Sequence, residues 1–286
     1  MGLKIAIGGK GGVGKTTVCA IWSQLLVDDG FDVLAIDADP NTNLAMAFGL
    51  SPDKVPEQLI NMKELIAERT GTDRASVGAY FKLNPEVSDI PEKYWIRVPI
   101  FQKDIPPDSV DNDTKRDLEV RNEKSSKTVK LLVLGGITQA GSGCACPDGA
   151  FLKALLTYAI LQRQEIVMID LAAGVEFMGR ASIQGIDALV VITEPGARSI
   201  ETANRIASMA KELGIKHTAA VINKITDKAQ LEKIKAKLTI PIAGSILYNL
   251  AVQEADLNGI SVFEASPILV QELRKAKDNL QNMISD

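Results

Sequence analysis

The chain has 286 residues, 46% hydrophobic and 24% charged, proportions typical of a globular protein with a sizeable core. Its formal net charge of -4 argues against non-specific nucleic-acid binding, which needs a basic surface, and no apolar run approaches the ~20 residues of a membrane span. Three cysteines, an odd number, do not make a disulfide framework and favour a reducing cytoplasm, and no signal peptide is expected because a strand begins almost at once.

The first motif is a phosphate loop. The pattern G-x-x-x-x-G-K-[ST] is matched by Gly9, Gly14, Lys15 and Thr16. Glycines let backbone N–H groups turn inward around a polyphosphate, and a helix expected over 16–28 points its positive N-terminal end at the same anion. Lys15 can reach the β- and γ-phosphates, and the Thr16 hydroxyl can hold Mg²⁺. The predicted nucleotide-binding residues here are Gly9, Gly11, Gly12, Val13, Gly14, Lys15, Thr16 and Thr17.

Lys10 is a second lysine at the start of this loop, where a simple phosphate cradle does not require one. It can be an exposed surface lysine. However, Lys-Gly-Gly-Val-Gly-Lys-Thr-Thr resembles the deviant Walker A motif of the MinD/ParA/nitrogenase-iron-protein group of dimeric ATPases. The resemblance implies that Lys10 crosses a homodimer interface to the partner's nucleotide, as an arginine finger supplies charge in trans. Lys10 and Lys15 are therefore candidate catalytic residues.

Two expected strands lead into aspartates. The strand at 32–36 is followed by Asp37 and Asp39, at the edge where open α/β sheets bind ligands. The strand at 165–169 ends in Asp170, the Walker B arrangement, whose carboxylate reaches Mg²⁺ directly or through water. By resemblance, Asp39 orients the attacking water as a switch I residue, and Asp37 helps with Mg²⁺ or its water shell. The alternatives are solvated turn aspartates and an ordinary strand-ending residue.

Two later residues complete the expected nucleotide site. Gly174 would place its N–H near the γ-phosphate as part of switch II. Asn223 follows the strand expected at 218–222, where an asparagine amide can pair with adenine or simply form a turn. The GTPase signature Asn-Lys-x-Asp is absent because Thr226 replaces its aspartate, which favours ATP over GTP. His217 is the only histidine, so a Ser/His/Asp triad or a His-based zinc site is close to excluded.

The segment Cys144-Ala-Cys146 is a candidate metal site. Two thiols one residue apart in an extended segment point to the same side, so both can hold one ion. A metal that prefers four ligands needs two more, and a two-fold dimer supplies them. Four thiolates suit Zn²⁺ when tetrahedral and Ni²⁺ when closer to square-planar. The alternative, a pair of buried loop cysteines, is disfavoured by the flanking glycines and Pro147, whereas Cys19 is expected to be a core residue.

The remaining pattern alternates strands and helices. We expect strands at 3–7, 32–36, 130–134, 165–169, 188–192, 218–222 and 240–244. We expect helices at 16–28, 44–50, 55–70, 148–162, 197–213 and 227–238, followed by C-terminal helices. Repeated strand–helix units with nearly continuous apolar strands predict an α/β fold: a mostly parallel sheet of about seven to eight strands with helices on both faces.

The character of the sequence changes between 80 and 127. Prolines, Pro91 among them, are expected to break any helix, and 104–127 is crowded with charges of both signs. We expect one domain spanning 1–286, with a charged, Pro-rich insertion at about 81–128. The insertion can be a long surface excursion or a docking segment for a partner protein. Its anchors in the second case would be Tyr80, Phe81, Tyr94, Trp95 and Phe101.

A narrower resemblance covers nearly the whole chain. Its motifs are Leu83-Asn-Pro-Glu, Ile90-Pro-Glu-Lys-Tyr94, Gly143-Cys-Ala-Cys-Pro147 and Gly179-Arg180, and they are similar to those of the CooC/AcsF family of nickel-insertion ATPases. The resemblance implies an ATP- and magnesium-dependent metallochaperone that serves carbon monoxide dehydrogenase or acetyl-CoA synthase. Cys144 and Cys146 of two subunits would bind nickel (or zinc) at the dimer interface, and ATP binding would close the dimer.

Two departures from that family leave the client enzyme open. Ala172 and Phe177 replace the Glu and His that commonly follow the Walker B aspartate, and the charged stretch at 104–127 looks longer than usual. Two other functions are compatible with the phosphate loop. The first is a spatial regulator of the MinD or ParA kind. MinD needs a membrane-binding amphipathic helix at its C-terminus, whereas residues 268–284 have mixed charge and are expected to form a helix packed on the domain. The second is an iron–sulfur carrier or reductase like the nitrogenase iron protein. That protein holds its cluster with two cysteines far apart in sequence, which is not the arrangement of Cys144 and Cys146.

Overall fold

The computed structural model of the protein describes residues 2–72, 81–98, 128–136, 146–174 and 185–285. Several expectations fall on residues outside these ranges: Tyr80, Phe101, Cys144, Phe177, Gly179 and Arg180. Most of the predicted insertion also lies outside them, so its extent and role stay predictions.

The centre of the molecule is an eight-stranded sheet with the order β3-β4-β2-β5-β1-β6-β7-β8. The strands are β1 (Lys4–Gly9), β2 (Val33–Ala38), β3 (Ile96–Val98), β4 (Val129–Val133), β5 (Ile166–Leu171), β6 (Ala188–Thr193), β7 (His217–Ile225) and β8 (Ile242–Leu247). All neighbouring pairs are parallel except β3 and β4. The predicted fold class is confirmed.

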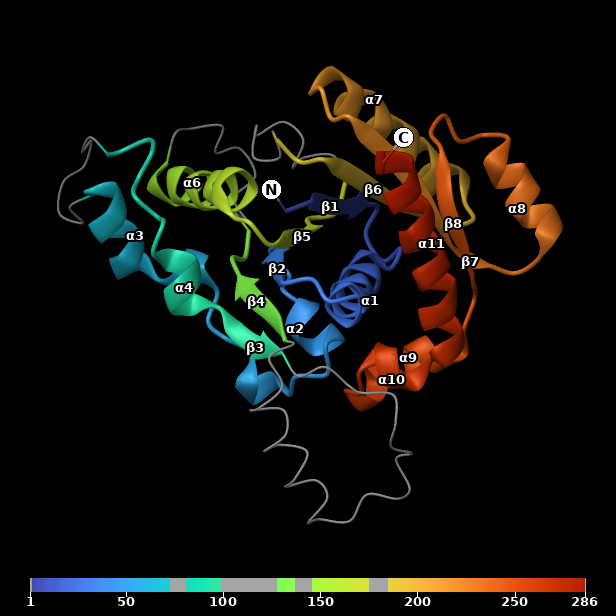
Figure 1. Cartoon of the computed structure of the whole chain (residues 1–286), viewed down its shortest axis with the longest axis horizontal. Coiled ribbons are helices and arrows are strands. Elements are labelled where there is room, and N and C mark those ends of the chain that lie inside the picture. Colours follow the sequence, from blue (N-terminus) through green and yellow to red (C-terminus); the bar gives the residue numbers. More distant parts are fainter. Residues whose placement is uncertain (1, 73–80, 99–127, 137–145, 175–184, 286) are drawn as a thin grey trace, which may run out of the picture.

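Helices cover both faces of this sheet (Figure 1). They are α1 (Lys15–Asp28), α2 (Leu44–Ala47), α3 (Lys63–Thr70), α4 (Ile90–Tyr94), α6 (Pro147–Gln162), α7 (Ala197–Glu212), α8 (Lys228–Lys235), α9 (Leu250–Asn258), α10 (Val262–Ala265) and α11 (Pro267–Ser285). In the part of the chain that is described, no helix combines the length and apolar character needed to cross a membrane.

Two large hydrophobic cores lie on the two faces. Because successive strand residues point to opposite sides, Ile5 and Ile7 of β1 belong to one core and Ala6 to the other. The first core includes α1 and α11, which lie side by side (Figure 1); the Trp22 indole of α1 donates to the Leu273 carbonyl of α11 at 3.0 Å. The second core includes α6 and α7. Both faces of the central strands are therefore buried, as their unbroken apolar sequences predict.

A cluster of charged side chains lies at the edge of the sheet where β5 begins. Glu165, just before β5, accepts hydrogen bonds from the Arg163 guanidinium and from Lys130 Nζ, the latter at 2.8 Å. Burial alone would raise the pKa of Glu165, but these two cations hold it at about 2. Its negative charge is thus matched within the cluster.

Three predictions of local structure were wrong in part. The helix expected at 55–70 is replaced in its first half by a short 3₁₀ turn, Leu59–Asn61, because the Ile60 N–H bonds to the Leu134 carbonyl at the end of β4. Pro91 lies in the first turn of α4, where proline is tolerated because no backbone N–H is needed there. The segment that follows forms β3, an antiparallel edge strand, where no strand was expected.

Candidate functional site

The carboxyl ends of β1, β2 and β5 bring the predicted aspartates to the phosphate loop. In the parallel register, Asp170 is aligned with Asp37 on β2 and with Ile7 on β1, two residues before Gly9. The loop then runs from Gly9 into the first turn of α1. The three segments that the sequence analysis singled out therefore converge at one edge of the sheet, as the rule for ligand sites in open α/β sheets predicts.

Two glycines of the loop cannot be replaced without displacing their neighbours. Gly9 has φ 145°, and a Cβ atom there would lie 2.3 Å from the Ile192 carbonyl oxygen. Gly14, the residue that caps α1, has φ 100°, and a Cβ atom there would lie 2.5 Å from Asn223 Nδ2. The loop backbone thus packs closely against β6 at Gly9 and against the Asn223 side chain of β7 at Gly14, in conformations that residues with a side chain rarely adopt.

The two lysines of the loop differ in their surroundings. Lys15 is only 6% exposed, and its Nζ donates to the Lys10 carbonyl at 3.4 Å. Lys10 is half-buried. Lys15 therefore folds back over the loop from the start of α1, in the position from which a lysine reaches bound phosphates. The crossing of Lys10 into a partner subunit stays a prediction.

Thr16 and Asp170 form the polar floor of the site. The Thr16 hydroxyl donates to Asp170 Oδ2 at 2.7 Å, and the other carboxylate oxygen, Oδ1, is buried without a hydrogen-bond partner among the described residues. Burial raises the pKa of Asp170 to about 7, with the hydrogen bond from Thr16 opposing and the nearby charge of Asp37 adding to the rise. A buried, unpaired carboxylate oxygen beside a hydroxyl matches the oxygen ligands that Mg²⁺ prefers.

Asp37 and Asp39 have different roles in the fold. Asp37 is fully buried and accepts hydrogen bonds from the backbone N–H groups of Leu44, at 2.9 Å, and Asp39, at 3.2 Å. Burial raises its pKa to about 6. Asp39 is partly exposed and accepts the Asn41 N–H at 2.8 Å. Asp37 therefore fixes the chain between β2 and α2, and Asp39 lies in the loop that Asp37 holds.

Gly174 lies against the phosphate loop. Its N–H donates to the Gly9 carbonyl at 3.0 Å in an isolated antiparallel bridge between the two residues. Gly174 therefore lies beside the phosphate loop, but its N–H is bonded to the loop backbone, and its contact with the γ-phosphate stays a prediction. Ala172, two residues earlier, is half-buried.

Asn223 and Lys224 contact the loop from β7. Asn223 lies within the strand, not after it, and its Nδ2 donates to the Val13 carbonyl at 2.8 Å. Lys224 Nζ donates to the Gly12 carbonyl at 2.7 Å and pairs with Glu194 Oε2 at 2.8 Å. Neither Lys224 nor Glu194 was expected at the site from the sequence. Lys224 follows Asn223 directly, but no motif links either residue to Glu194, which the parallel pairing of β6 and β7 brings close.

Cys146 occupies the N-cap position of α6. Its Sγ accepts a hydrogen bond from the Gly149 N–H at 3.3 Å, and the side chain is partly exposed. Because α6 runs back to the start of β5, its first residue lies toward the same edge of the sheet as the phosphate loop. Within the described ranges, no three His, Cys, Asp or Glu side chains gather as a metal site. Cys19 is buried in α1, as expected.

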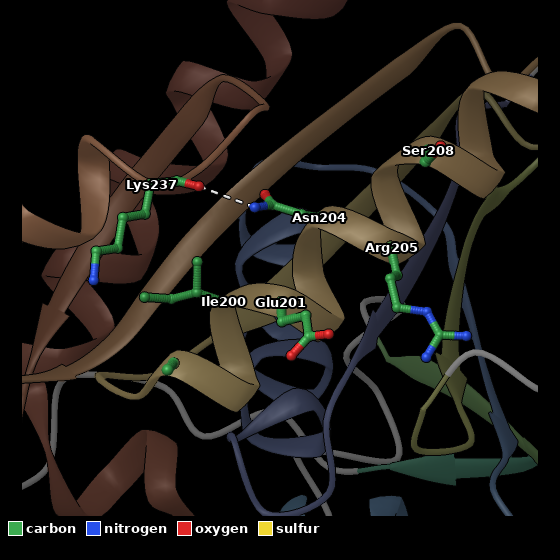
Figure 2. Close-up of a pocket in the computed structure, with 7 residues that line it drawn as sticks. Ile200, Glu201, Asn204, Arg205, Ser208 and Lys237 are labelled. Atoms are coloured by element: carbon green, nitrogen blue, oxygen red, sulfur yellow. Dashed lines mark hydrogen bonds between the residues drawn. The ribbon is translucent and has the colours of Figure 1, made fainter.

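A separate pocket of about 430 Å³ lies on the outer side of α7 (Figure 2). Its lining residues are Ala197, Ile200, Glu201, Asn204, Arg205, Ser208 and Lys237. Asn204 closes one side of it by donating to the Lys237 carbonyl at 2.9 Å, the dashed line in Figure 2. None of the lining residues belongs to the phosphate loop or to the aspartate cluster, so this pocket is not the predicted site.

Comparison with known proteins places the chain among nucleotide-binding relatives. A family model described as the CobQ/CobB/MinD/ParA nucleotide binding domain matches residues 4–262. The carbon monoxide dehydrogenase accessory protein CooC of Rhodospirillum rubrum is 37% identical over 268 residues, which are 93% of this chain and 91% of CooC. An uncharacterized ATP-binding protein of Methanocaldococcus jannaschii is 35% identical over 260 residues, 90% of each chain.

Solved structures share the fold. MinD of Pyrococcus horikoshii OT3, complexed with Mg-ADP, has a TM-score of 0.64 over 99% of this chain and 97% of its own, at 18% identity. A plasmid partition protein of Borrelia burgdorferi B31 bound to AMPPNP has a TM-score of 0.64 over 99% of this chain and all of its own, at 14% identity. The family match and the meeting of the phosphate loop with the aspartates at one edge of the sheet lead to one conclusion: the chain belongs to the CobQ/CobB/MinD/ParA nucleotide-binding family and is an ATPase.

Proposed function

We propose that this ATPase is a nickel metallochaperone that matures carbon monoxide dehydrogenase or acetyl-CoA synthase. The observation that carries the proposal is the position of Cys146, half of a Cys-x-Cys pair, at the start of α6 and toward the sheet edge that holds the phosphate loop. The 37% identity to CooC, named for carbon monoxide dehydrogenase, supports the same function. A metal held there can respond to the state of the nucleotide.

In the proposed nucleotide site, the chain's own residues bind and orient the phosphates. Amides of the loop and the N-terminal end of α1 surround the phosphate oxygens, and Lys15 reaches the β- and γ-phosphates. Thr16 and Asp170 would hold Mg²⁺, with Asp37 close to its water shell; when bound, the ion neutralises the negative charge that develops on the phosphates. Asp39 orients the attacking water from its partly exposed loop.

The proposed dimer places a second lysine at each nucleotide. Lys10 of each subunit crosses to the partner's phosphates and adds its charge to that of the partner's own Lys15 in stabilising the transition state. The γ-phosphate then favours a closed dimer, and its loss on hydrolysis favours an open one. For Gly174 to contact the γ-phosphate, its N–H has to leave the Gly9 carbonyl, which gives switch II two positions to alternate between.

The nickel ion is the cargo of this cycle. Cys144 and Cys146 of the two subunits would supply four sulfur ligands across the two-fold axis. Opening of the dimer separates the two pairs and weakens the site, which releases the ion to the client enzyme.

An anaerobic metal titration tests this function. The protein should bind one Ni²⁺ per two chains, and Cys144→Ala and Cys146→Ala should each lose this binding. Cys19→Ala is the matched control, since Cys19 is a buried cysteine of α1 that the site does not use, and it should bind as the native protein does. Full nickel binding by the Cys144→Ala/Cys146→Ala double variant would exclude these cysteines as the metal site.

The structure does not favour a MinD-like membrane role for α11. Its apolar residues Leu269, Leu273 and Leu280 are buried in the core that α1 shares, and Lys277 Nζ pairs with Asp29 at 2.8 Å while only 2% of Lys277 is exposed. A helix bound in this way does not offer its apolar face to a bilayer. Binding to liposomes would contradict this conclusion.

A further inference from the structure

Two neighbouring side chains of β7 hold the phosphate loop by its backbone. We propose that Asn223 and Lys224 are positioning residues, which set the direction of the amides that bind phosphate. Asn223 Nδ2 holds the Val13 carbonyl, and Lys224 Nζ holds the Gly12 carbonyl. The proposal rests on the proposed function to the extent that residues 9–16 bind the phosphates of the nucleotide. It does not depend on the nickel cargo.

The direction of a carbonyl fixes the direction of the amide that follows it. In a trans peptide, the C=O of one residue and the N–H of the next point to opposite sides, and the described residues contain no cis peptide bond. Since the carbonyls of Gly12 and Val13 point toward β7, the N–H groups of Val13 and Gly14 point away from it. Gly14 caps α1, so its N–H lies where a helix N-terminus binds anions.

The backbone of β7 is distorted at the two residues in question. Neighbouring strand residues normally point to opposite faces, so Asn223 and Lys224 could not both reach the loop from a regular strand. Lys224 has φ 60°, the one positive value among the described residues other than glycine. The pairing of β7 with β8 also shifts register between Ile222 and Ile225, as at a β-bulge. This distortion turns both side chains toward the loop, and such strained residues concentrate at functional sites.

Glu194 makes Lys224 a fixed donor. Its carboxylate lies 2.8 Å from Lys224 Nζ, at the end of β6, and both side chains are partly exposed. The ion pair offsets the charge of the lysine and restricts its rotation, so that the ammonium is held on the Gly12 carbonyl. Asn223 is fixed as well, because its Oδ1 accepts the Lys224 N–H at 2.8 Å while its Nδ2 donates to Val13. The two side chains and the loop backbone form one hydrogen-bonded unit.

Binding of ADP and of inorganic pyrophosphate, each with Mg²⁺, tests the proposal by competition with a fluorescent ADP analogue. Asn223→Ala and Lys224→Met should each weaken both ligands by the same factor, about tenfold, because the loop amides bind the phosphates that the two ligands share. Lys224→Arg can still donate to Gly12 and pair with Glu194, and it should keep most of the affinity. Lys216→Met, the matched change of charge at the exposed start of β7, should bind both ligands as the native protein does.

Each contrary result has a distinct meaning. Weaker binding of ADP alone in Asn223→Ala would overturn the proposal for this residue, because it would show a contact to the base. Native affinities in both variants, with binding lost in Lys15→Ala, would overturn the proposal and leave the proposed function standing. Native binding by Lys15→Ala would overturn the phosphate-loop assignment itself. Lower thermal stability and affinity in Lys224→Met that Lys224→Arg does not restore would show a merely structural role.

Discussion

Replacement of Asp170 by asparagine should stabilise the metal-free protein at high pH. Asp170 is 1% exposed, and burial raises its pKa from an ordinary value of 3.8 to about 7. Between these two pH values the folded protein keeps a proton that the unfolded chain has released, so its stability falls as the pH rises. The difference is worth roughly 4 kcal/mol, at about 1.36 kcal/mol for each pH unit. Asparagine cannot ionise and removes this slope.

The assay is urea unfolding in EDTA, without nucleotide, from pH 4 to pH 8. The free energy of unfolding of Asp170→Asn, minus that of the native protein, should rise across this range by up to roughly 4 kcal/mol. A buried amide without a partner adds a destabilisation of about 1–3 kcal/mol, but that contribution is the same at every pH. Because the pKa of Asp37 is raised to about 6, Asp37 makes the free energy of unfolding of both proteins depend on pH below about pH 6.

The control is Ser199→Ala, a buried change on α7 without an ionisable group, which should shift stability equally at every pH. Parallel pH curves for Asp170→Asn and the native protein would refute the reasoning. The same substitution should abolish ATP hydrolysis, since it removes the carboxylate proposed to hold Mg²⁺.

Three further predictions concern the ion cluster and the loop. Glu165→Gln should lower the free energy of unfolding at pH 7 by about 1–3 kcal/mol, because Arg163 and Lys130 lose their carboxylate partner. Since the pKa of Glu165 is depressed to about 2, this loss of stability should shrink as the pH falls from about 4.5 through 2. A loss of stability that does not depend on pH would contradict this. Gly14→Ala should weaken ADP binding, measured by titration calorimetry, at least about tenfold, because the new Cβ atom would meet Asn223. The control is Gly30→Ala: Gly30 has φ 96° and open space around it, so this change should lower stability without weakening ADP binding. Lys15→Ala should abolish nucleotide binding, and Lys10→Ala should slow steady-state hydrolysis far more than it weakens binding; equal effects on both would count against the trans role of Lys10.

The centre of the site was predictable because its signals are local. Glycines and a lysine at fixed spacing define the loop, and each aspartate follows a buried strand, so parallel pairing had to bring Asp37 and Asp170 to the same edge. The Thr16–Asp170 hydrogen bond follows from the same convergence. What the motif could not indicate is that one oxygen of Asp170 has no hydrogen-bond partner among the described residues, since that depends on every neighbour.

The parts that sequence reasoning missed depend on pairing between distant segments. The first half of the helix expected at 55–70 does not form, because the Ile60 N–H bonds to the Leu134 carbonyl just after β4. Tertiary contacts of this kind override local helix propensity. β3 exists because it pairs with β4, which its three residues alone do not indicate. Lys224 reaches the loop through a bulge, and a strand predicted to end at residue 222 left no place for it.

The central claim is that ATP hydrolysis opens a dimer and releases its nickel. The most direct measurement is a single-turnover reaction of the nickel-loaded protein with Mg-ATP, in which a colorimetric chelator reports free Ni²⁺ while phosphate release is followed in parallel. Ni²⁺ should leave at the rate of hydrolysis in the native protein and be retained in Lys10→Ala. Equal retention of nickel before and after hydrolysis would contradict it.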